Sequence, residues 1–69
     1  MPERCAEIID RLIEERIKRG MTQRELAEAV KIPQSTIGRM ENKSHAPQLD
    51  TLVKVAQALD CDITVVSNA

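Results

Sequence analysis

The sequence predicts an all-α fold in which four helices form one bundle and a short C-terminal β-strand follows them. Three observations lead to this prediction. Apolar residues recur at three- and four-residue steps along most of the chain, which is the period of an amphipathic helix. Gly20, Pro33 and Pro47 interrupt that period and divide it into segments. Phe, Tyr and Trp are absent, so the core must consist of small and aliphatic side chains, which suits closely spaced short helices.

The first predicted helix spans residues 3–19. Pro2 suits its start, and Glu3 complements the positive end of the helix dipole. Gly20 supplies a left-handed residue that ends the helix. The inward face should consist of Cys5, Ile8, Ile9, Leu12, Ile13 and Ile17.

Two shorter helices joined by a tight turn should follow. Thr22 and Glu25 have the spacing of a capping box, which predicts a helix over residues 22–30. Pro33 lacks an amide hydrogen and disfavours helical geometry in the residue before it, so the chain must turn over three residues. The next helix then covers residues 34–42.

A fourth helix is predicted over residues 49–59, after a loop that contains Pro47. Together with the first three helices, it should complete a single core. Its inward-facing residues should be Leu49, Leu52, Val53, Ala56 and Leu59.

The segment 61–66 is rich in β-branched residues, which predicts a strand rather than a fifth helix. A lone strand leaves its backbone groups unpaired, and the sequence shows no second strand. We hypothesise that this strand pairs with the same strand of a second protomer, which would give a two-fold homodimer. The alternative is an extended tail packed on the first helix.

Length and composition restrict the class of protein. Sixty-nine residues suffice for one domain, 1–69, without a separate ligand-sensing domain. The charged N-terminus lacks a signal-peptide core and no apolar run could span a membrane, so we expect a cytoplasmic protein. Cys5 and Cys61 are too few and too widely spaced for a disulfide framework or a zinc site, so neither metal nor cofactor is expected. A single histidine without paired carboxylates argues against an enzyme.

The net charge of −1 is unusual for a protein that binds nucleic acid, but its distribution is uneven. Residues 31–48 contain three bases and one acid, whereas residues 1–30 contain six bases and seven acids. Residues 49–69 contain one base and three acids. DNA responds to the local field of the surface that meets it, so this distribution permits phosphate binding and predicts weak nonspecific affinity.

These features together resemble the Cro/C1-type helix-turn-helix family, also called the xenobiotic-response-element or lambda-repressor-like family. The resemblance covers residues 13–59 and places the helix-turn-helix at residues 22–42. It implies a lambda-repressor-like bundle. The matching residues are Arg19-Gly20, Met21-Thr22-Gln23, Glu25-Leu26-Ala27, Gln34-Ser35-Thr36-Ile37, Met40-Glu41-Asn42, Pro47, Leu49-Asp50-Thr51-Leu52 and Ala56.

The resemblance implies a transcriptional regulator, in particular a repressor, that binds a double-stranded DNA operator with two half-sites. In this family the second helix of the pair enters the major groove. The residues implied for base contacts are Gln34, Ser35, Thr36 and Arg39. Those implied for phosphate contacts are Gln23, Asn42 and Lys43. Polar residues at such positions are also common on a solvated helix, but the surrounding motif favours DNA contact.

Four further residues have expected roles outside base readout. Lys31 stands where the family often has glycine, so backbone strain is expected in the turn. Gly38 costs its helix about 1 kcal/mol relative to alanine, which suggests a close approach to DNA or to the preceding helix. Glu41 should pair with a base of the first helix such as Arg16 rather than contact DNA. His45 has no neighbouring metal ligand and should lie near phosphate.

The main alternative function is an antitoxin-like module that neutralises a partner toxin and regulates its own operon. Such proteins can have the same fold. The acidic first helix and the C-terminal strand would then form the partner surface. A neighbouring gene for a small basic toxin, or a stable complex on co-expression, would distinguish this function.

Overall fold

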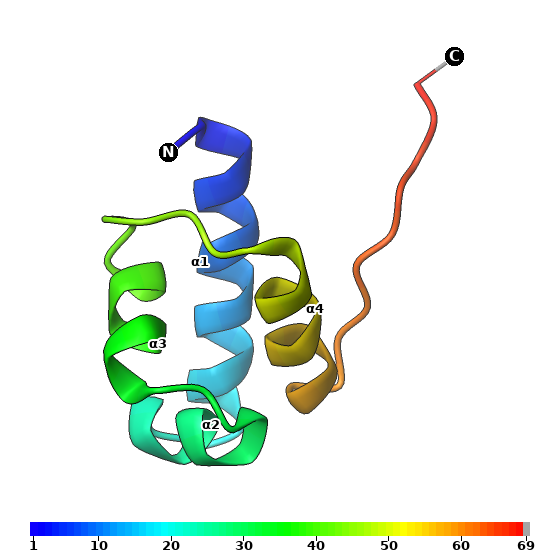
Figure 1. Cartoon of the computed structure of the whole chain (residues 1–69). Helices are drawn as coiled ribbons and strands as arrows, with labels where there is room; N and C mark the ends of the chain where they lie inside the picture. Colours follow the sequence, from blue (N-terminus) through cyan, green and yellow to red (C-terminus); the bar gives the residue numbers. More distant parts are fainter. Residues whose placement is uncertain (69) are drawn as a thin grey trace.

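The computed structural model describes residues 1–68, which form four α-helices and no β-strand. The predicted all-α class is confirmed, and every predicted helix boundary lies within one residue of the observed one. Ala69, the last residue of the predicted domain, lies outside the described residues. Within residues 1–68, no helix combines the length and apolar character that a membrane span requires. The helices are α1 (Glu3–Lys18), α2 (Gln23–Val30), α3 (Gln34–Glu41) and α4 (Leu49–Ala58) (Figure 1).

Local hydrogen bonds determine both ends of α2. The Glu25 amide donates to the Thr22 hydroxyl and the Thr22 amide donates to the Glu25 carboxylate, each at 3.0 Å, which confirms the predicted capping box. At the other end, Lys31 adopts left-handed geometry with φ of 58°. The amides of Lys31 and Ile32 both donate to the Ala27 carbonyl, so α2 stops there and the turn into α3 begins.

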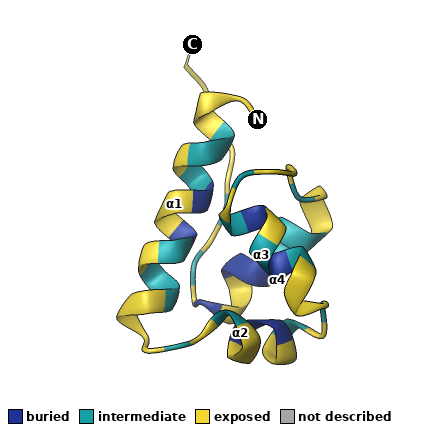
Figure 2. Cartoon of the chain, turned by 90° about the vertical axis from the view of Figure 1, so that its left-hand side faces the viewer, coloured by how far each residue is buried: buried dark blue, intermediate teal, exposed yellow. Residues whose placement is uncertain are grey.

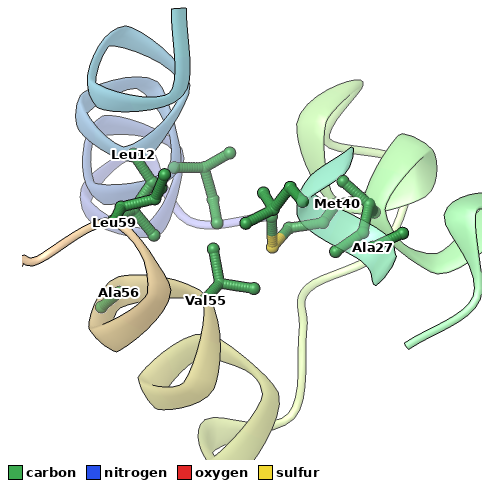
Figure 3. Packing of buried hydrophobic residues seen from close by; sticks show 9 residues of the cluster. Leu12, Ala27, Met40, Val55, Ala56 and Leu59 are labelled. Carbon is green, nitrogen blue, oxygen red and sulfur yellow. The ribbon is translucent and has the colours of Figure 1, made fainter. Parts of the chain in front are cut away.

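One apolar core lies between the four helices (Figure 3). Each helix contributes buried residues to it, and Leu59 joins the core directly after α4. Exposed residues lie on the outer faces of the helices (Figure 2). The helix-turn-helix pair is therefore held against α1 and α4 by shared apolar packing. The buried set is Ile9, Leu12, Leu26, Ala27, Ile37, Met40, Val55, Ala56 and Leu59.

Two residues predicted to face the core are exposed instead. Leu49 is 72% exposed and Ile17 is 62% exposed. Leu49 begins α4 and Ile17 lies in the last turn of α1, so both stand at helix ends that extend beyond the core. Val55, which was missing from the predicted inward face, is completely buried. The helical period identifies an apolar stripe but not how much of its length another element covers.

The predicted strand over residues 61–66 is wrong. After Asp60 reverses the chain with φ of 55°, the described residues of the tail run in an extended form without strand pairing (Figure 1). Cys61 and Ile63 are partly buried against the core, whereas Val65 and Val66 are 94% and 78% exposed. The β-branched composition favours an extended backbone, but a strand also needs a neighbour for its ladder of hydrogen bonds. Residues 1–68 supply none.

Candidate nucleic-acid interface

The exposed face of α3 carries the side chains predicted to contact bases. Gln34, Ser35 and Arg39 are exposed, and Thr36 is half-buried. Arg39 follows Ser35 by four residues, so both lie on one side of the helix. The opposite side is anchored by the buried residues Ile37 and Met40. The structure thus brings the four predicted base-contacting residues together on one short helix. The buried side of that helix packs against the core.

The first turn of α3 begins at a proline, which provides no side-chain cap. Pro33 is the N-cap, and its carbonyl accepts from the amides of Thr36 at 2.9 Å and Ile37 at 3.3 Å. Because the earlier amides of a helix have no intrahelical acceptor, those of Gln34 and Ser35 point forward from this end. A helix start of this kind attracts anionic groups such as phosphate.

A polar network fixes the other end of α3. Arg16 of α1 donates to both carboxylate oxygens of Glu41, with Nε–Oε2 and Nη2–Oε1 distances of 2.8 Å. The same guanidinium donates from Nη1 to the Met21 carbonyl at 2.7 Å. The expected pairing of Glu41 with Arg16 is confirmed. It is a bidentate, partly buried ion pair that connects α1 with the end of α3.

Gln23, a predicted phosphate contact, belongs to this network. Its Nε2 donates to Glu41 Oε1 at 3.2 Å, and the side chain is half-buried at the start of α2. An amide nitrogen carries two hydrogens, so one remains for another acceptor. The Gln23 side chain also lies next to Gly38. A Cβ added to Gly38 would be 3.6 Å from Gln23 Oε1. That distance is an ordinary contact, so the packing of α2 does not require glycine at this position.

Asn42 and Lys43, the other predicted phosphate contacts, follow directly after α3. The Ser44 amide donates to Asn42 Oδ1 at 2.8 Å, which directs the Asn42 side chain and leaves its amide hydrogens available. Lys43 has left-handed geometry with φ of 62°, and its ammonium forms an ion pair with Asp10 of α1. Sequence spacing does not indicate this pair, because its two residues are 33 positions apart along the chain.

A groove of about 290 Å³ lies between α3 and the start of α4. Thr36 and Arg39 line it from α3, and His45 lines it from the loop. Two polar residues that the sequence interpretation did not assign to the site, Gln48 and Thr51, line its opposite wall. No spacing along the chain indicates this proximity, which depends on how the loop 43–48 folds back toward α3.

A family model and a solved structure match this chain. A helix-turn-helix family model matches residues 12–66, a range that contains every predicted site residue. No curated protein matches. Among solved structures, the chain is similar to a variant of HipB in its complex with an O2 20mer. The two share 29% sequence identity with a TM-score of 0.83, over 94% of this chain and 90% of that one.

Proposed function

Because the chain belongs to the Cro/C1-type helix-turn-helix family, we propose that it is a transcriptional repressor that reads a double-stranded DNA operator. One observation carries the proposal: α3 buries Ile37 and Met40 while it presents Gln34, Ser35 and Arg39 to solvent. The second helix of such a pair docks in the major groove. In this proposal residues 1–69 act as one domain, in the cytoplasm and without enzymatic activity.

Base readout belongs to the face of α3. The Gln34 amide has one donor and one acceptor side, which match adenine N7 and N6 in the major groove. The Arg39 guanidinium matches guanine O6 and N7 in the same bidentate manner. Ser35 and Thr36 have hydroxyls that suit a base edge or a nearby phosphate. Side chains of this kind give sequence preference rather than general affinity.

Phosphate contacts hold α3 in register on the duplex. Gln23 approaches from the start of α2, and its hydrogen bond to Glu41 places it near the end of α3, where Asn42 and Lys43 follow. With ten basic and eleven acidic residues, the chain has no excess of positive charge to add to these contacts. Its affinity for unrelated DNA should therefore be low.

We also propose that two copies bind one operator. A single short helix on a chain of charge −1 makes few contacts, and a second recognition helix on the next half-site would multiply them. The half-sites would then be about 34 Å apart on one face of the duplex. The 20mer in the HipB complex is long enough for two half-sites separated by about one helical turn. A strand at residues 61–66 is not part of this proposal.

Selection of bound sequences from a random duplex pool tests the proposal. We expect enrichment of an inverted repeat whose half-site centres are about 10 base pairs apart. Gln34→Ala should change the enriched sequence, whereas Lys54→Ala, which removes an exposed base outside the site, should not. A folded wild-type protein that enriches no common sequence would contradict sequence-specific binding.

A second candidate function, an antitoxin-like module, is favoured by the surface between α1 and the tail. An open groove of about 850 Å³ lies there, with Ile8, Leu12 and Ile63 among its lining residues and charged side chains of α1 around them. Val65 extends beyond it almost fully exposed. Co-expression with the products of neighbouring genes, followed by size-exclusion chromatography, tests for a stable partner. A Val65→Asp variant that retains the partner fully would contradict the use of this surface.

A further inference from the structure

An ion pair connects α1 with the residue that directly follows the recognition helix. The Lys43 ammonium contacts the Asp10 carboxylate, although 33 positions separate the two residues in sequence. We infer that Asp10 is an affinity-setting residue, whose carboxylate competes with DNA phosphate for Lys43. This inference rests on the proposed function, because it assigns Lys43 to the phosphate backbone.

Hydrogen bonds hold the backbone at Lys43, whereas its side chain is bound by the exposed ion pair with Asp10. The Lys43 amide donates to the Met40 carbonyl at 3.1 Å, and the next amide, of Ser44, donates to the Arg39 carbonyl at 3.1 Å. The side chain begins from this fixed point and consists of a flexible four-carbon stem with a terminal ammonium. It can therefore turn from Asp10 toward a phosphate without any movement of α3.

Among the bases of the positive segment 31–48, Lys43 differs in that it forms an ion pair with an acid. The other two, Lys31 and Arg39, have no acidic partner among residues 1–68. Asp10 thus neutralises one of the three cations in the segment that should meet DNA. When a phosphate takes its place, Asp10 must recruit a cation from solution, which partly offsets the cations that the DNA releases.

The exposure of the pair permits this exchange. The side chains are 34% exposed at Lys43 and 56% exposed at Asp10, so water and salt screen their attraction. Exposed pairs of this kind alter an equilibrium by a factor of about 1.4 to 5. Since the phosphate contact is the same for every base sequence, Asp10 should lower affinity for operator and random DNA by a common factor.

Asp10→Asn tests the inference by fluorescence anisotropy with a selected operator and a random duplex. We expect about 1.4- to fivefold tighter binding per subunit on both DNAs. The salt dependence should also become steeper, by up to about 0.9 in the slope of log K against log salt per subunit. Glu14→Gln is the matched control, because it removes one exposed acid from the same helix without involving Lys43.

A double-mutant cycle with Lys43→Ala separates the specific pair from general charge effects. Lys43→Ala should weaken DNA binding more in the Asp10→Asn background than in the wild type. Equal losses in both backgrounds would overturn the inference, and so would an Asp10→Asn effect no larger than that of Glu14→Gln. If the wild type binds DNA but Asp10→Asn changes nothing, this inference alone fails. If the folded wild type binds no DNA, the proposed function fails and this inference fails with it.

Discussion

Arg16 binds both carboxylate oxygens of Glu41 at 2.8 Å and thereby joins α1 to the last residue of α3. The two side chains are only 13% and 7% exposed. Gln23 adds a hydrogen bond of 3.2 Å to the same carboxylate, so α2 is connected as well. The end of the recognition helix is therefore fixed by polar contacts to both neighbouring helices, while its middle is fixed by apolar packing.

Arg16→Lys should lower the free energy of unfolding by about 1–2 kcal/mol. Lysine keeps the charge but loses the planar fork that reaches both carboxylate oxygens and the Met21 carbonyl at once. Urea unfolding followed by circular dichroism measures the change. Arg24→Lys is the control, since its ion pair with Glu28 is well exposed and should contribute less than about 0.5 kcal/mol. If both variants lose the same free energy of unfolding, the partly buried network of Arg16 contributes no more to stability than an exposed ion pair.

Gly38→Ala should stabilise the protein and weaken DNA binding. Alanine is more favourable than glycine inside a helix by about 0.5–1 kcal/mol, and its Cβ would meet only Gln23 Oε1 at an ordinary distance. Close packing on α2 therefore does not explain the glycine, and approach of DNA remains the other interpretation. Thermal unfolding should shift upward by several degrees, about 4–8 °C per kcal/mol for a domain of this size.

Gly20→Ala is the matched control for this substitution. Gly20 has φ of +68°, where a Cβ is strained, so alanine should lower the melting temperature. A Gly38→Ala variant that is stabilised but retains full operator affinity would contradict close approach of DNA at that position.

Lys31→Gly should raise the free energy of unfolding by about 0.5–1 kcal/mol. Lys31 has φ of 58°, and relief of the strain on its Cβ should exceed the entropic cost of glycine. The observed left-handed geometry agrees with the strain expected from the sequence. Denaturant midpoints measure the effect, with Lys31→Ala as the control that removes the charge but keeps the Cβ. A similar gain from both variants would attribute the effect to charge instead of backbone geometry.

Features controlled by neighbouring residues were predictable from the sequence. The capping box of Thr22 and Glu25 and the proline at Pro33 act within a few residues, so they located α2, the turn and α3 correctly. The partner of Glu41 was expected among the bases of the first helix, and Arg16 takes that role. The base-contacting role of the exposed face of α3 was predicted from the surrounding motif. Polar residues on a helix would not have indicated it by themselves, because such residues are also common on solvated helices.

Features that depend on distant parts of the chain were not predictable in this way. Burial of Val55 and exposure of Leu49 depend on where α4 meets the rest of the bundle. The pair between Asp10 and Lys43 requires knowledge of which face of α1 the loop after α3 approaches. The tail from Cys61 has strand-like composition, yet composition does not supply a hydrogen-bonding neighbour.

Gln34→Ala and Lys43→Ala should have different effects on DNA recognition. Gln34 is exposed in the first turn of α3, and its loss should weaken operator binding by about 1–3 kcal/mol and relax the preference at one base pair. Arg39→Ala should do the same at another base pair. Lys43→Ala should weaken all sequences alike, because phosphates carry no base identity. Anisotropy titrations with the operator, single-base variants and a random duplex measure these differences. Equal losses on operator and random DNA for Gln34→Ala would assign that residue to the backbone, and α3 would then position the protein rather than read the sequence.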